Sequence, residues 1–271
     1  MVGLFLTRFK IRYYSKNLTN ESSTLFIGRP LIHLESVVST NGYLLDLTTK
    51  STPSEGTAVV ADIQTGGKGQ FGSSWHSEPG TNLLFSVLLQ PTFLPPVDQF
   101  MLSRVAALAV HGALADDFPG LVIKWPNDIW LEGRKVAGIL IENVLSGMHF
   151  RHSVIGIGLN VNQTVFPPHL PLAGSLAAVA GHPLPLEPLL HRIFQHLEHQ
   201  YLRLRRGDLD ELCADYEWSL HQLDVQARYA HPGEAPFDGI LRGVNREGFA
   251  LVEHAGTGIV RPYNLKEIRF L

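Results

Sequence analysis

The chain has 271 residues, of which 45% are hydrophobic and 17% charged, and its formal net charge is -3. This balance is typical of a folded globular protein, because disorder requires low hydrophobicity with high net charge and a membrane span requires about 18 consecutive apolar residues. The one cysteine, Cys213, excludes an intramolecular disulfide and a cysteine-rich zinc site. We therefore expect a cytoplasmic protein that binds neither membrane nor DNA, since a slight excess of acid argues against a dedicated nucleic-acid binder.

The one basic stretch is N-terminal and precedes the first acidic residue. Its basic residues are Arg8, Lys10, Arg12 and Lys16. Such a stretch is either a weak organelle transit peptide or an extension without structure, and it lacks a clear amphipathic face. We predict a disordered N-terminal extension over residues 1–28.

Short aliphatic runs bounded by Gly, Pro, Asn or Asp predict strands in the first part of the chain. They cover residues 59–64, 83–89, 122–124, 136–142 and 153–159. Between the second and third runs, residues 99–118 place Met101, Val105 and Leu108 at helical spacing, which predicts a core-facing helix with Asp98 as its N-cap.

Two further predicted helices, residues 187–206 and 209–223, are separated by Gly207-Asp208 as stop and cap. After Leu223 the pattern changes to short alternating segments divided by turns, which predicts a small β-barrel. These segments are residues 225–229, 237–244, 249–254, 258–262 and 268–271. The sequence thus predicts an α/β (α+β) fold, with a large domain over residues 29–223 and a barrel over residues 224–271.

Residues 67–72 read Gly-Lys-Gly-Gln-Phe-Gly and match G-x-G-x-x-G after a predicted strand. A dinucleotide-binding turn requires a helix after the last glycine, whereas Trp75, Pro79 and Gly80 follow here and lead into another strand. A Walker A loop is also excluded, because Lys68 lacks the preceding glycine spacing and a following Ser or Thr. The segment is either an anion-binding loop with one cation or a solvated surface loop.

Three other segments carry candidate site residues, and each has a purely structural alternative. Residues 124–128 (Lys-Trp-Pro-Asn-Asp), with Gly133-Arg134-Lys135 after them, are either a phosphate- or carboxylate-binding pair of lysines or a hairpin with exposed lysines. Residues 156–162 are either a strand that a ligand approaches closely or a tightly packed strand. Ser39-Thr40-Asn41 before a helical run is explained by N-capping alone.

Together and in this order, these segments form a recognisable set. The set comprises Ser39-Thr40-Asn41, residues 64–72 with Trp75, Asn82-Leu83, residues 124–128, residues 133–140 and Gly158-Leu159-Asn160. It resembles the biotin protein ligase family. The likeness extends from about Leu31 to Leu271, and its most specific element is the pair formed by residues 124–128 and 134–140.

The resemblance implies a catalytic domain related to class II aminoacyl-tRNA synthetases and an SH3-like C-terminal barrel. It implies that ATP drives attachment of biotin to a lysine of a biotin carboxyl-carrier domain of a carboxylase, through biotinyl-5′-AMP. Mg²⁺ would accompany ATP with no direct protein ligand assigned. A homodimer is one assembly that the sequence leaves open.

The resemblance also implies residue roles. Lys135 would be the catalytic residue, because its charge would relieve the repulsion between two anions and stabilise the transition state. The implied biotin-binding residues are Ser39, Thr40, Asn41, Gln64, Lys68, Gly69, Gln70, Lys135 and Gly138. The implied ATP- or adenylate-binding residues are Gly67, Lys68, Gln70, Trp75, Lys124, Asn127, Asp128 and Asn160.

The Gly-rich loop departs from the family pattern. Lys68 and Gln70 stand where arginines are usual, and Phe71 stands where another basic residue is frequent. Because lysine cannot form the bidentate fork of arginine, we expect the loop to hold the adenylate less tightly. About 30 residues precede the ligase-like region, too few for the winged helix-turn-helix domain of the DNA-binding members.

Two alternatives stay open beside a ligase. One is a lipoate or octanoate transferase of the same superfamily, whose usual loop and histidine pattern is absent. The other is a non-catalytic biotin-binding regulator. His191, His196 and His199 share one predicted helix, and we interpret them as hydrated histidines, because H-x-x-H without a carboxylate or third ligand does not make a closed metal site.

Overall fold

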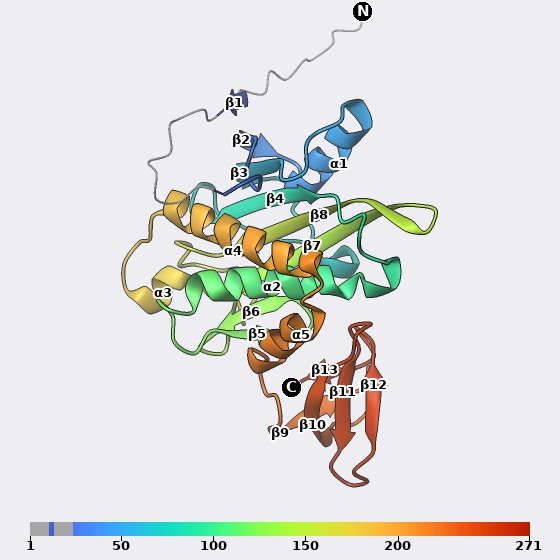
Figure 1. Cartoon of the computed structure of the whole chain (residues 1–271). Coiled ribbons are helices and arrows are strands. Elements are labelled where there is room, and N and C mark those ends of the chain that lie inside the picture. The colour runs from blue at the N-terminus through green and yellow to red at the C-terminus, as the bar shows by residue number, and fades with distance from the viewer. Residues whose placement is uncertain (1–10, 14–23) are drawn as a thin grey trace, which may run out of the picture.

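The computed structural model describes residues 11–13 and 24–271, which form two β-sheets with helices packed on the larger one (Figure 1). The larger sheet has eight strands in the order β1-β2-β3-β4-β8-β7-β6-β5, and β2 with β3 is its parallel pair among antiparallel neighbours. Its strands are β1 (Ile11–Tyr13), β2 (Leu31–Val37), β3 (Ala58–Gln64), β4 (Leu83–Leu89), β5 (Val122–Lys124), β6 (Asp128–Leu131), β7 (Arg134–Ser146) and β8 (His149–Leu159).

Helices cover both faces of this sheet. All seven residues of the central strand β4 are buried, as is usual for a strand covered on both sides. Phe85 and Val87 belong to the large core, whereas Leu88 belongs to a smaller cluster with Leu44 of α1 (Thr40–Lys50). Since side chains alternate between faces along a strand, α1 covers one face and the large core lies on the other.

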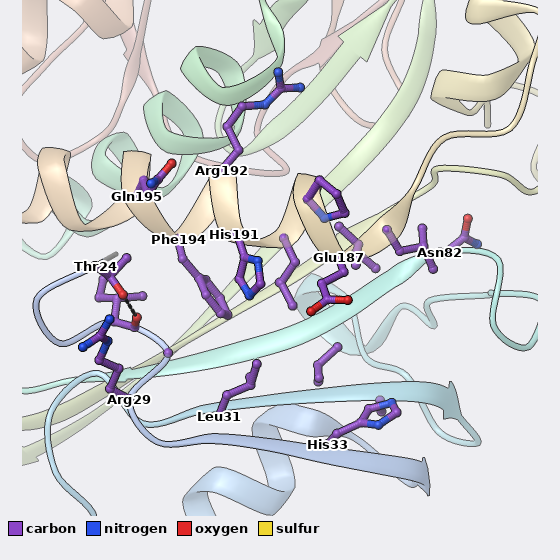
Figure 2. Close-up of a pocket in the computed structure, with 18 of the residues that line it drawn as sticks. Thr24, Arg29, Leu31, His33, Asn82, Glu187, His191, Arg192, Phe194 and Gln195 are labelled. Carbon is purple, nitrogen blue, oxygen red and sulfur yellow. Dashed lines mark hydrogen bonds between the residues drawn. The ribbon is translucent and has the colours of Figure 1, made fainter. Parts of the chain in front are cut away.

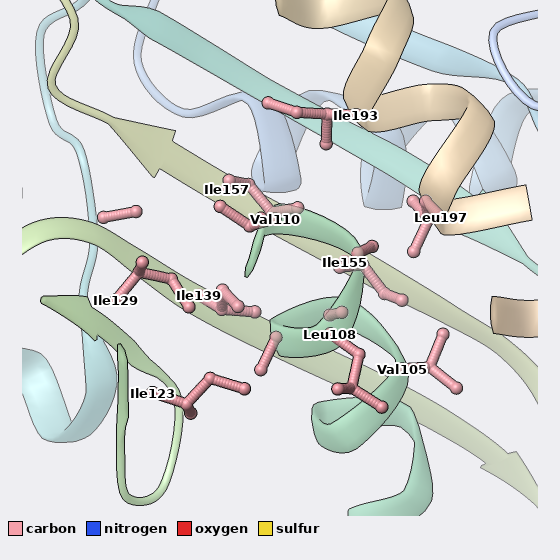
Figure 3. Packing of buried hydrophobic residues seen from close by; sticks show 14 of the residues in the cluster. Val105, Leu108, Val110, Ile123, Ile129, Ile139, Ile155, Ile157, Ile193 and Leu197 are labelled. Atoms are coloured by element: carbon pink, nitrogen blue, oxygen red, sulfur yellow. The ribbon is translucent and has the colours of Figure 1, made fainter. Parts of the chain in front are cut away.

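The large core lies between the sheet and two helices that pack on each other, α2 (Phe100–Leu114) and α4 (Leu186–Arg206). Figure 3 shows aliphatic side chains of both helices meeting those of the strands. The residues are Val105, Leu108 and Val110 of α2, Ile193 and Leu197 of α4, and Ile123, Ile129, Ile139, Ile155 and Ile157 of the sheet. Two shorter helices are α3 (Leu176–Ala180) and α5 (Leu209–Trp218).

Strands β4 and β5 have the predicted bounds, and β7 and β8 are longer than predicted. Their antiparallel pairing continues past the apolar runs to Ser146 and His149, so that they form a long hairpin. Strands β1, β2 and β6 were not predicted. The four-residue strand β6 is defined by its pairing with β5 and β7 more than by its own composition.

The prediction that Asp98 caps α2 is wrong. Pro95 begins a 3₁₀ turn, η2 (Pro96–Asp98), so that α2 starts two residues after Asp98 with Gln99 at the cap position. The Asp98 carboxylate instead pairs with Arg246 of the small sheet, with Nη2 and Oδ2 2.6 Å apart. The helix ends at Leu114, before the predicted end at residue 118.

Residues 11–13 and 24–28 contradict the predicted disordered extension over residues 1–28. Residues 11–13 form strand β1, which pairs antiparallel with β2. Ile27 is fully buried in the large core. The backbone amides of Leu25, Phe26 and Ile27 donate to the Glu198 carboxylate of α4 at 2.6 to 3.0 Å. A buried side chain and three satisfied amides hold these residues, which composition alone does not show. Residues 1–10 and 14–23 lie outside the described residues.

The second sheet has five antiparallel strands in the order β12-β11-β10-β9-β13, so the predicted cluster of short C-terminal strands is confirmed. The strands are β9 (Gln226–Ala230), β10 (Phe237–Val244), β11 (Ala250–His254), β12 (Val260–Tyr263) and β13 (Arg269–Phe270). Helix α5 ends at Trp218, not at residue 223, because Leu220 and Leu223 form isolated bridges with β5 and β10.

The two sheets are joined through α2. Arg104 is fully buried and donates from Nη2 to the carbonyl oxygens of Val244 and Asn245, at 2.8 Å each. Its guanidinium also lies over the ring of Tyr216, 5.6 Å from the centroid. A buried cation with such partners fixes the small sheet against the large one. Within residues 11–13 and 24–271, no helix is long and apolar enough to cross a membrane.

Candidate functional site

A cavity of about 300 Å³ brings together segments that are far apart in the sequence. The start of α1, the end of β3, the Gly-rich loop, the turn between β5 and β6, and strands β7 and β8 border it, and Leu265 of the small sheet's last loop also lines it. The predicted site residues that line it are Ser39, Thr40, Asn41, Gln64, Lys68, Gly69, Gln70, Trp75, Asn127, Asp128, Lys135 and Gly138. Gly67, Lys124 and Asn160 are not among its lining residues.

The N-terminus of α1 and the end of β3 form one polar wall. Ser39 is the N-cap of α1, and its hydroxyl accepts from the Gly42 amide at 3.4 Å. The backbone N–H of Thr40 lies in the first helical turn, where it has no acceptor within the helix. It donates instead to Gln64 Oε1 at 2.7 Å. Ser39 therefore caps α1, as the structural alternative expects, and the start of this helix also lines the cavity.

Asn41 belongs to a buried polar cluster beside this wall. Its Nδ2 donates to Glu142 Oε2 at 2.8 Å, and its Oδ1 lies 2.6 Å from Ser86 Oγ. A Cβ on Gly156 would overlap with Asn41 Oδ1. The missing side chain of Gly156 therefore makes room for Asn41. At this position the glycine serves tight packing within the protein, the second of the two alternatives for residues 156–162.

The Gly-rich loop folds back on itself. Gly69 N donates to Ser73 O at 2.7 Å, and Trp75 N donates to Gly67 O at 2.9 Å. Lys68 and Ser74 form an isolated antiparallel bridge at the neck of the loop. The segment after the loop continues into strand β4, as predicted when the dinucleotide-binding turn was excluded. Lys68, Gly69 and Gln70 are therefore presented to the cavity by a closed turn.

The indole of Trp75 lies on the sheet beside Lys135. A Cβ on Gly158 would overlap with the indole, and one on Gly138 would lie 2.9 Å from Trp75 Cζ3. The two glycines on adjacent strands thus form the surface that receives the ring. Trp75 Nε1 is buried without a hydrogen-bond partner among the described residues. Lys135 Nζ lies 5.9 Å from the ring centroid.

Lys135 is a cation of the cavity wall and forms an ion pair with a carboxylate. Its Nζ lies 2.7 Å from Asp128 Oδ1, and both side chains are partly exposed. The neighbouring Asn127 is buried, and its Nδ2 donates to Ile139 O. Strand β7 and the first residue of β6 therefore hold an ammonium and a carboxylate at one wall, where the ammonium can turn to another anion.

Lys124 and Asn160 lie apart from the lining. Lys124 Nζ lies 4.0 Å from the ring centroid of Trp130. Burial lowers the pKa of Lys124, the nearby Asp128 opposes that effect, and Lys135 adds to it. Asn160 is buried and donates from Nδ2 to Gly174 O at 3.0 Å.

Sequence reasoning missed several contributors to this site. They include Ser73 and Ser74 of the lining as well as Ser86, Glu142 and Leu265. Ser86 is a fully buried hydroxyl in an otherwise apolar strand, and that single polar residue was a usable signal. Glu142 ends an apolar run on β7, and nothing local connects it with Asn41. Leu265 comes from the small sheet, so only the packing of the two sheets brings it to the cavity.

A second, larger cavity of about 690 Å³ lies between α4 and strands β2 to β4 (Figure 2). Leu31 and Phe194 point into it, whereas Arg192 and Gln195 point to the other side of α4, where Arg192 pairs with Asp117. It holds none of the predicted site residues. Within residues 11–13 and 24–271, no group of three or more His, Cys, Asp or Glu could hold a metal.

Known proteins are similar to this chain over most of its length. The pattern of the biotin/lipoate A/B protein ligase family matches residues 34–160. A Bacillus subtilis protein named bifunctional ligase/repressor BirA is 32% identical over 247 residues, which cover 89% of this chain and 74% of that protein. A Mycobacterium tuberculosis protein named biotin–(acetyl-CoA-carboxylase) ligase is 28% identical, and the alignment covers 82% of each chain.

Solved structures lead to the same group of proteins. The biotin protein ligase of Aquifex aeolicus, solved in complex with biotin and ATP, superimposes with a TM-score of 0.73. It is 29% identical, and the superposition covers 89% of this chain and 98% of that one.

Proposed function

The chain belongs to the biotin protein ligase family, and from this premise we propose that the cavity lined by Lys135 is where biotin is activated and transferred. The overall reaction is the ATP-dependent attachment of biotin to a lysine of a carboxylase carrier domain, through biotinyl-5′-AMP. The assignment depends on one observation. The Lys135 ammonium, the polar start of α1 and the Gly-rich loop all line the same cavity.

In the first step, a carboxylate oxygen of biotin attacks the α-phosphorus of ATP. A new P–O bond forms, the bond from that phosphorus to the bridging oxygen of the β-phosphate breaks, and pyrophosphate leaves. Lys135 would move from Asp128 to the two approaching anions, reduce their repulsion and stabilise the charge of the pentavalent transition state. Asp128 is then the group that holds the ammonium in place beforehand.

In the second step, the neutral amine of the acceptor lysine attacks the acyl carbon of biotinyl-5′-AMP. An amide bond forms, AMP leaves with the electron pair of the broken C–O bond, and the nitrogen gives up a proton. The adenylate is held long enough for transfer only if the Gly-rich loop covers it, and we assign that work to Lys68, Gly69 and Gln70. Gly67 would allow the close approach of the backbone.

The polar wall suits the ureido ring of biotin. The ring has two N–H donors and one carbonyl acceptor, each of which needs a partner when buried. Ser39, Thr40 and Gln64 provide hydroxyl and amide groups there, and Asn41 supports them from the neighbouring cluster. Gly138 also lines the cavity and is assigned to the biotin side, where its missing side chain lets the Trp75 indole and the Lys135 ammonium approach the sheet closely.

The nucleotide side is assigned to the residues around the β5–β6 turn. Trp75 would lie beside the base, and Asn127, Asp128, Lys124 and Asn160 would support the phosphates or the loop. Mg²⁺ would be held chiefly by the phosphate oxygens of ATP and by waters, and it would reduce the negative charge of the phosphates. Asp128 at the cavity wall adds one carboxylate to that environment.

We assign residues 29–223 to a catalytic domain like that of class II aminoacyl-tRNA synthetases and residues 224–271 to an SH3-like barrel. Supporting the division, the larger sheet and its helices end with α5, and the five short antiparallel strands begin with β9. The acceptor is a biotin carboxyl-carrier domain, in line with the name of the Mycobacterium tuberculosis relative.

Exchange of labelled pyrophosphate into ATP tests the activation step, and capture by streptavidin of an added carboxyl-carrier domain tests the transfer. Both signals should require biotin, and a carrier domain whose acceptor lysine is replaced by arginine should stay unlabelled. Exchange with lipoate or octanoate in place of biotin would assign the chain to the transferase branch. Biotin binding without exchange would identify a non-catalytic regulator.

A further inference from the structure

Strand β7 has an irregularity at the position of Lys135. The pairing of β7 with β6 skips one residue between Lys135 and Ala137, so Val136 is an extra residue of β7. Such a bulge redirects the neighbouring side chains and disrupts the ladder of backbone hydrogen bonds. The placement of the Lys135 ammonium therefore depends on what pairs with the backbone at the bulge.

The segment 172–174 lies beside this bulge, where β8 has already ended. Strand β8 pairs with β7 as far as Ala137 and does not reach Lys135. The Lys135 N–H donates to Leu172 O at 2.8 Å, and the Gly174 N–H donates to Lys135 O at 3.0 Å. These two bonds form an isolated parallel bridge, so the segment pairs with β7 at the lysine itself.

The segment is anchored on its other side. Asn160 Nδ2 donates to Gly174 O at 3.0 Å, and the Asn160 backbone N–H donates to Val136 O at 2.8 Å. One buried residue therefore contacts both the segment and the bulge. Leu176, two residues beyond Gly174, is fully buried in the large core. The backbone groups at the bulge are thus paired with a segment that the core holds in place.

Gly174 is the residue that permits this close pairing. It is buried, and a Cβ at this position would lie 2.7 Å from Arg134 Cβ and 3.1 Å from Arg134 Cδ. Turning the end of the Arg134 side chain cannot relieve the first contact, because a Cβ moves with its backbone. A side chain at residue 174 would therefore push the segment away from β7 and lengthen the two hydrogen bonds to Lys135.

We propose that Gly174 is a positioning residue for the reaction and acts through Lys135. With the segment 172–174 it holds the bulge of β7, so that the Lys135 ammonium lies at the cavity wall beside Asp128. A fixed backbone matters here because a misplacement of about 1 Å can lower a rate by roughly 10²-fold. The inference rests on the proposed function, since it takes Lys135 as the group that stabilises the transition state. It extends that function to a segment outside the cavity lining.

Gly174→Ala tests the proposal in biotin-dependent pyrophosphate exchange by the full chain. We expect kcat to fall about 10- to 100-fold, while the Kd of biotin changes less than about 3-fold, because the start of α1 and the Gly-rich loop are unaltered. Ala173→Gly cannot clash and adds backbone freedom to the segment, so it keeps the test valid if Gly174→Ala does not fold. It should lower kcat about 2- to 5-fold. Gly256→Ala is the matched control and should keep the wild-type kcat, because a Cβ there would meet no atom of the described residues within 4 Å.

Two double variants separate a positioning role from a structural one. In a Lys135→Ala background, Gly174→Ala should have no further effect on kcat, because its effect passes through the lysine. An Arg134→Gly background lacks the Cβ that the new methyl group would meet, and there Gly174→Ala should lower kcat less than about 3-fold. The full loss in either background, or wild-type kcat in Gly174→Ala itself, would show that the proposal is wrong.

Amide hydrogen exchange at Lys135, followed by NMR, tests the same contacts without a measurement of activity. The hydrogen bond to Leu172 O should make this exchange slow in the wild type. Gly174→Ala should speed it about 10-fold or more, while the amides of β4 keep their rates. Equal rates at Lys135 in the two proteins would contradict the proposal. A wild-type chain that lacks biotin-dependent pyrophosphate exchange would contradict the proposed function instead.

Discussion

Trp125 and Phe270 stack with ring centroids 5.9 Å apart and an interplanar angle of 29°. Trp125 belongs to the turn that lines the cavity, and Phe270 belongs to the last strand of the small sheet. Trp125 Nε1 also donates to Gly248 O at 2.9 Å, so the indole has two partners on the small sheet. The C-terminal sheet therefore forms part of the frame of the cavity.

Removing this stacking should affect catalysis as well as stability. Phe270→Ala takes away the ring beside Trp125, and aromatic pairs contribute about 0.5–1.5 kcal/mol beyond their buried area. We expect kcat/KM for biotin-dependent pyrophosphate exchange to fall about 3- to 30-fold, because the turn that carries Asn127 and Asp128 loses a support. Trp218→Ala, at a tryptophan that is 90% exposed, is the control. A lower Tm with unchanged kinetics would show that the small sheet only stabilises the fold.

Lys135→Ala should fold normally and lose adenylate formation. Lys135 is partly exposed at the start of β7, so the core does not depend on it. We expect the exchange rate to fall by about 10²-fold or more, as when one positioned donor to a transition-state charge is removed. Lys50→Ala removes an exposed lysine from α1 and should keep the full rate. Wild-type exchange in the Lys135 variant would contradict its assigned role.

Gln70→Arg should make the protein hold biotinyl-5′-AMP more tightly. Gln70 lines the cavity and offers a neutral hydrogen bond, whereas charged hydrogen bonds contribute about 1.5–3 kcal/mol against roughly 1 for neutral ones. We expect release of the intermediate to slow by about 3- to 30-fold, with little change in the rate of adenylation.

Stopped-flow measurement of the dissociation rate tests this prediction. His76→Arg places the same charge on an exposed residue of the same segment that does not line the cavity, and should leave the dissociation rate unchanged. An equal rate for wild type and Gln70→Arg would mean that other groups already close the loop.

Stability should fall as the pH drops below 6.5. Burial lowers the pKa of His111 below its usual 6.5, and the hydrogen bond to Leu121 O opposes this only in part. Below pH 6.5 the unfolded chain binds a proton that the folded chain does not, so the stabilisation present above pH 6.5 is lost as the pH falls toward the folded pKa. Burial lowers the pKa of four other histidines as well: His152, His196, His221 and His254.

His111→Gln separates the contribution of this residue, because the amide can still donate to Leu121 O and does not titrate. Denaturant unfolding at pH 7 and at pH 5 should show a smaller difference for the variant than for the wild type. His199→Gln, on the exposed side of α4, is the matched control. If the His111 variant shows the same difference in unfolding free energy between pH 7 and pH 5 as the wild type, another group is responsible for the pH dependence.

Local features of the sequence determined much of the fold. An apolar run interrupted only by Ser86 predicts β4, because a strand covered on both faces is apolar at nearly every position. Ser39 marks the start of α1, because its hydroxyl accepts from an unpaired amide of the first turn. Gly207 marks the end of α4, because glycine readily adopts the left-handed conformation found there. The set of sequence motifs also included most of the residues that line the cavity. Each motif is a contiguous segment, and its residue types indicate what kind of group it can bind.

Only the tertiary structure decided the contacts between such segments. Asp98 could have capped α2, yet it pairs with Arg246, almost 150 residues away in the chain. Ser86 and Glu142 meet Asn41 because β4, β8 and β7 are neighbours in one sheet and α1 packs across them. Periodicity and capping depend on neighbours a few residues apart, whereas a side-chain hydrogen bond depends on the packing of elements distant in sequence, which local patterns do not specify.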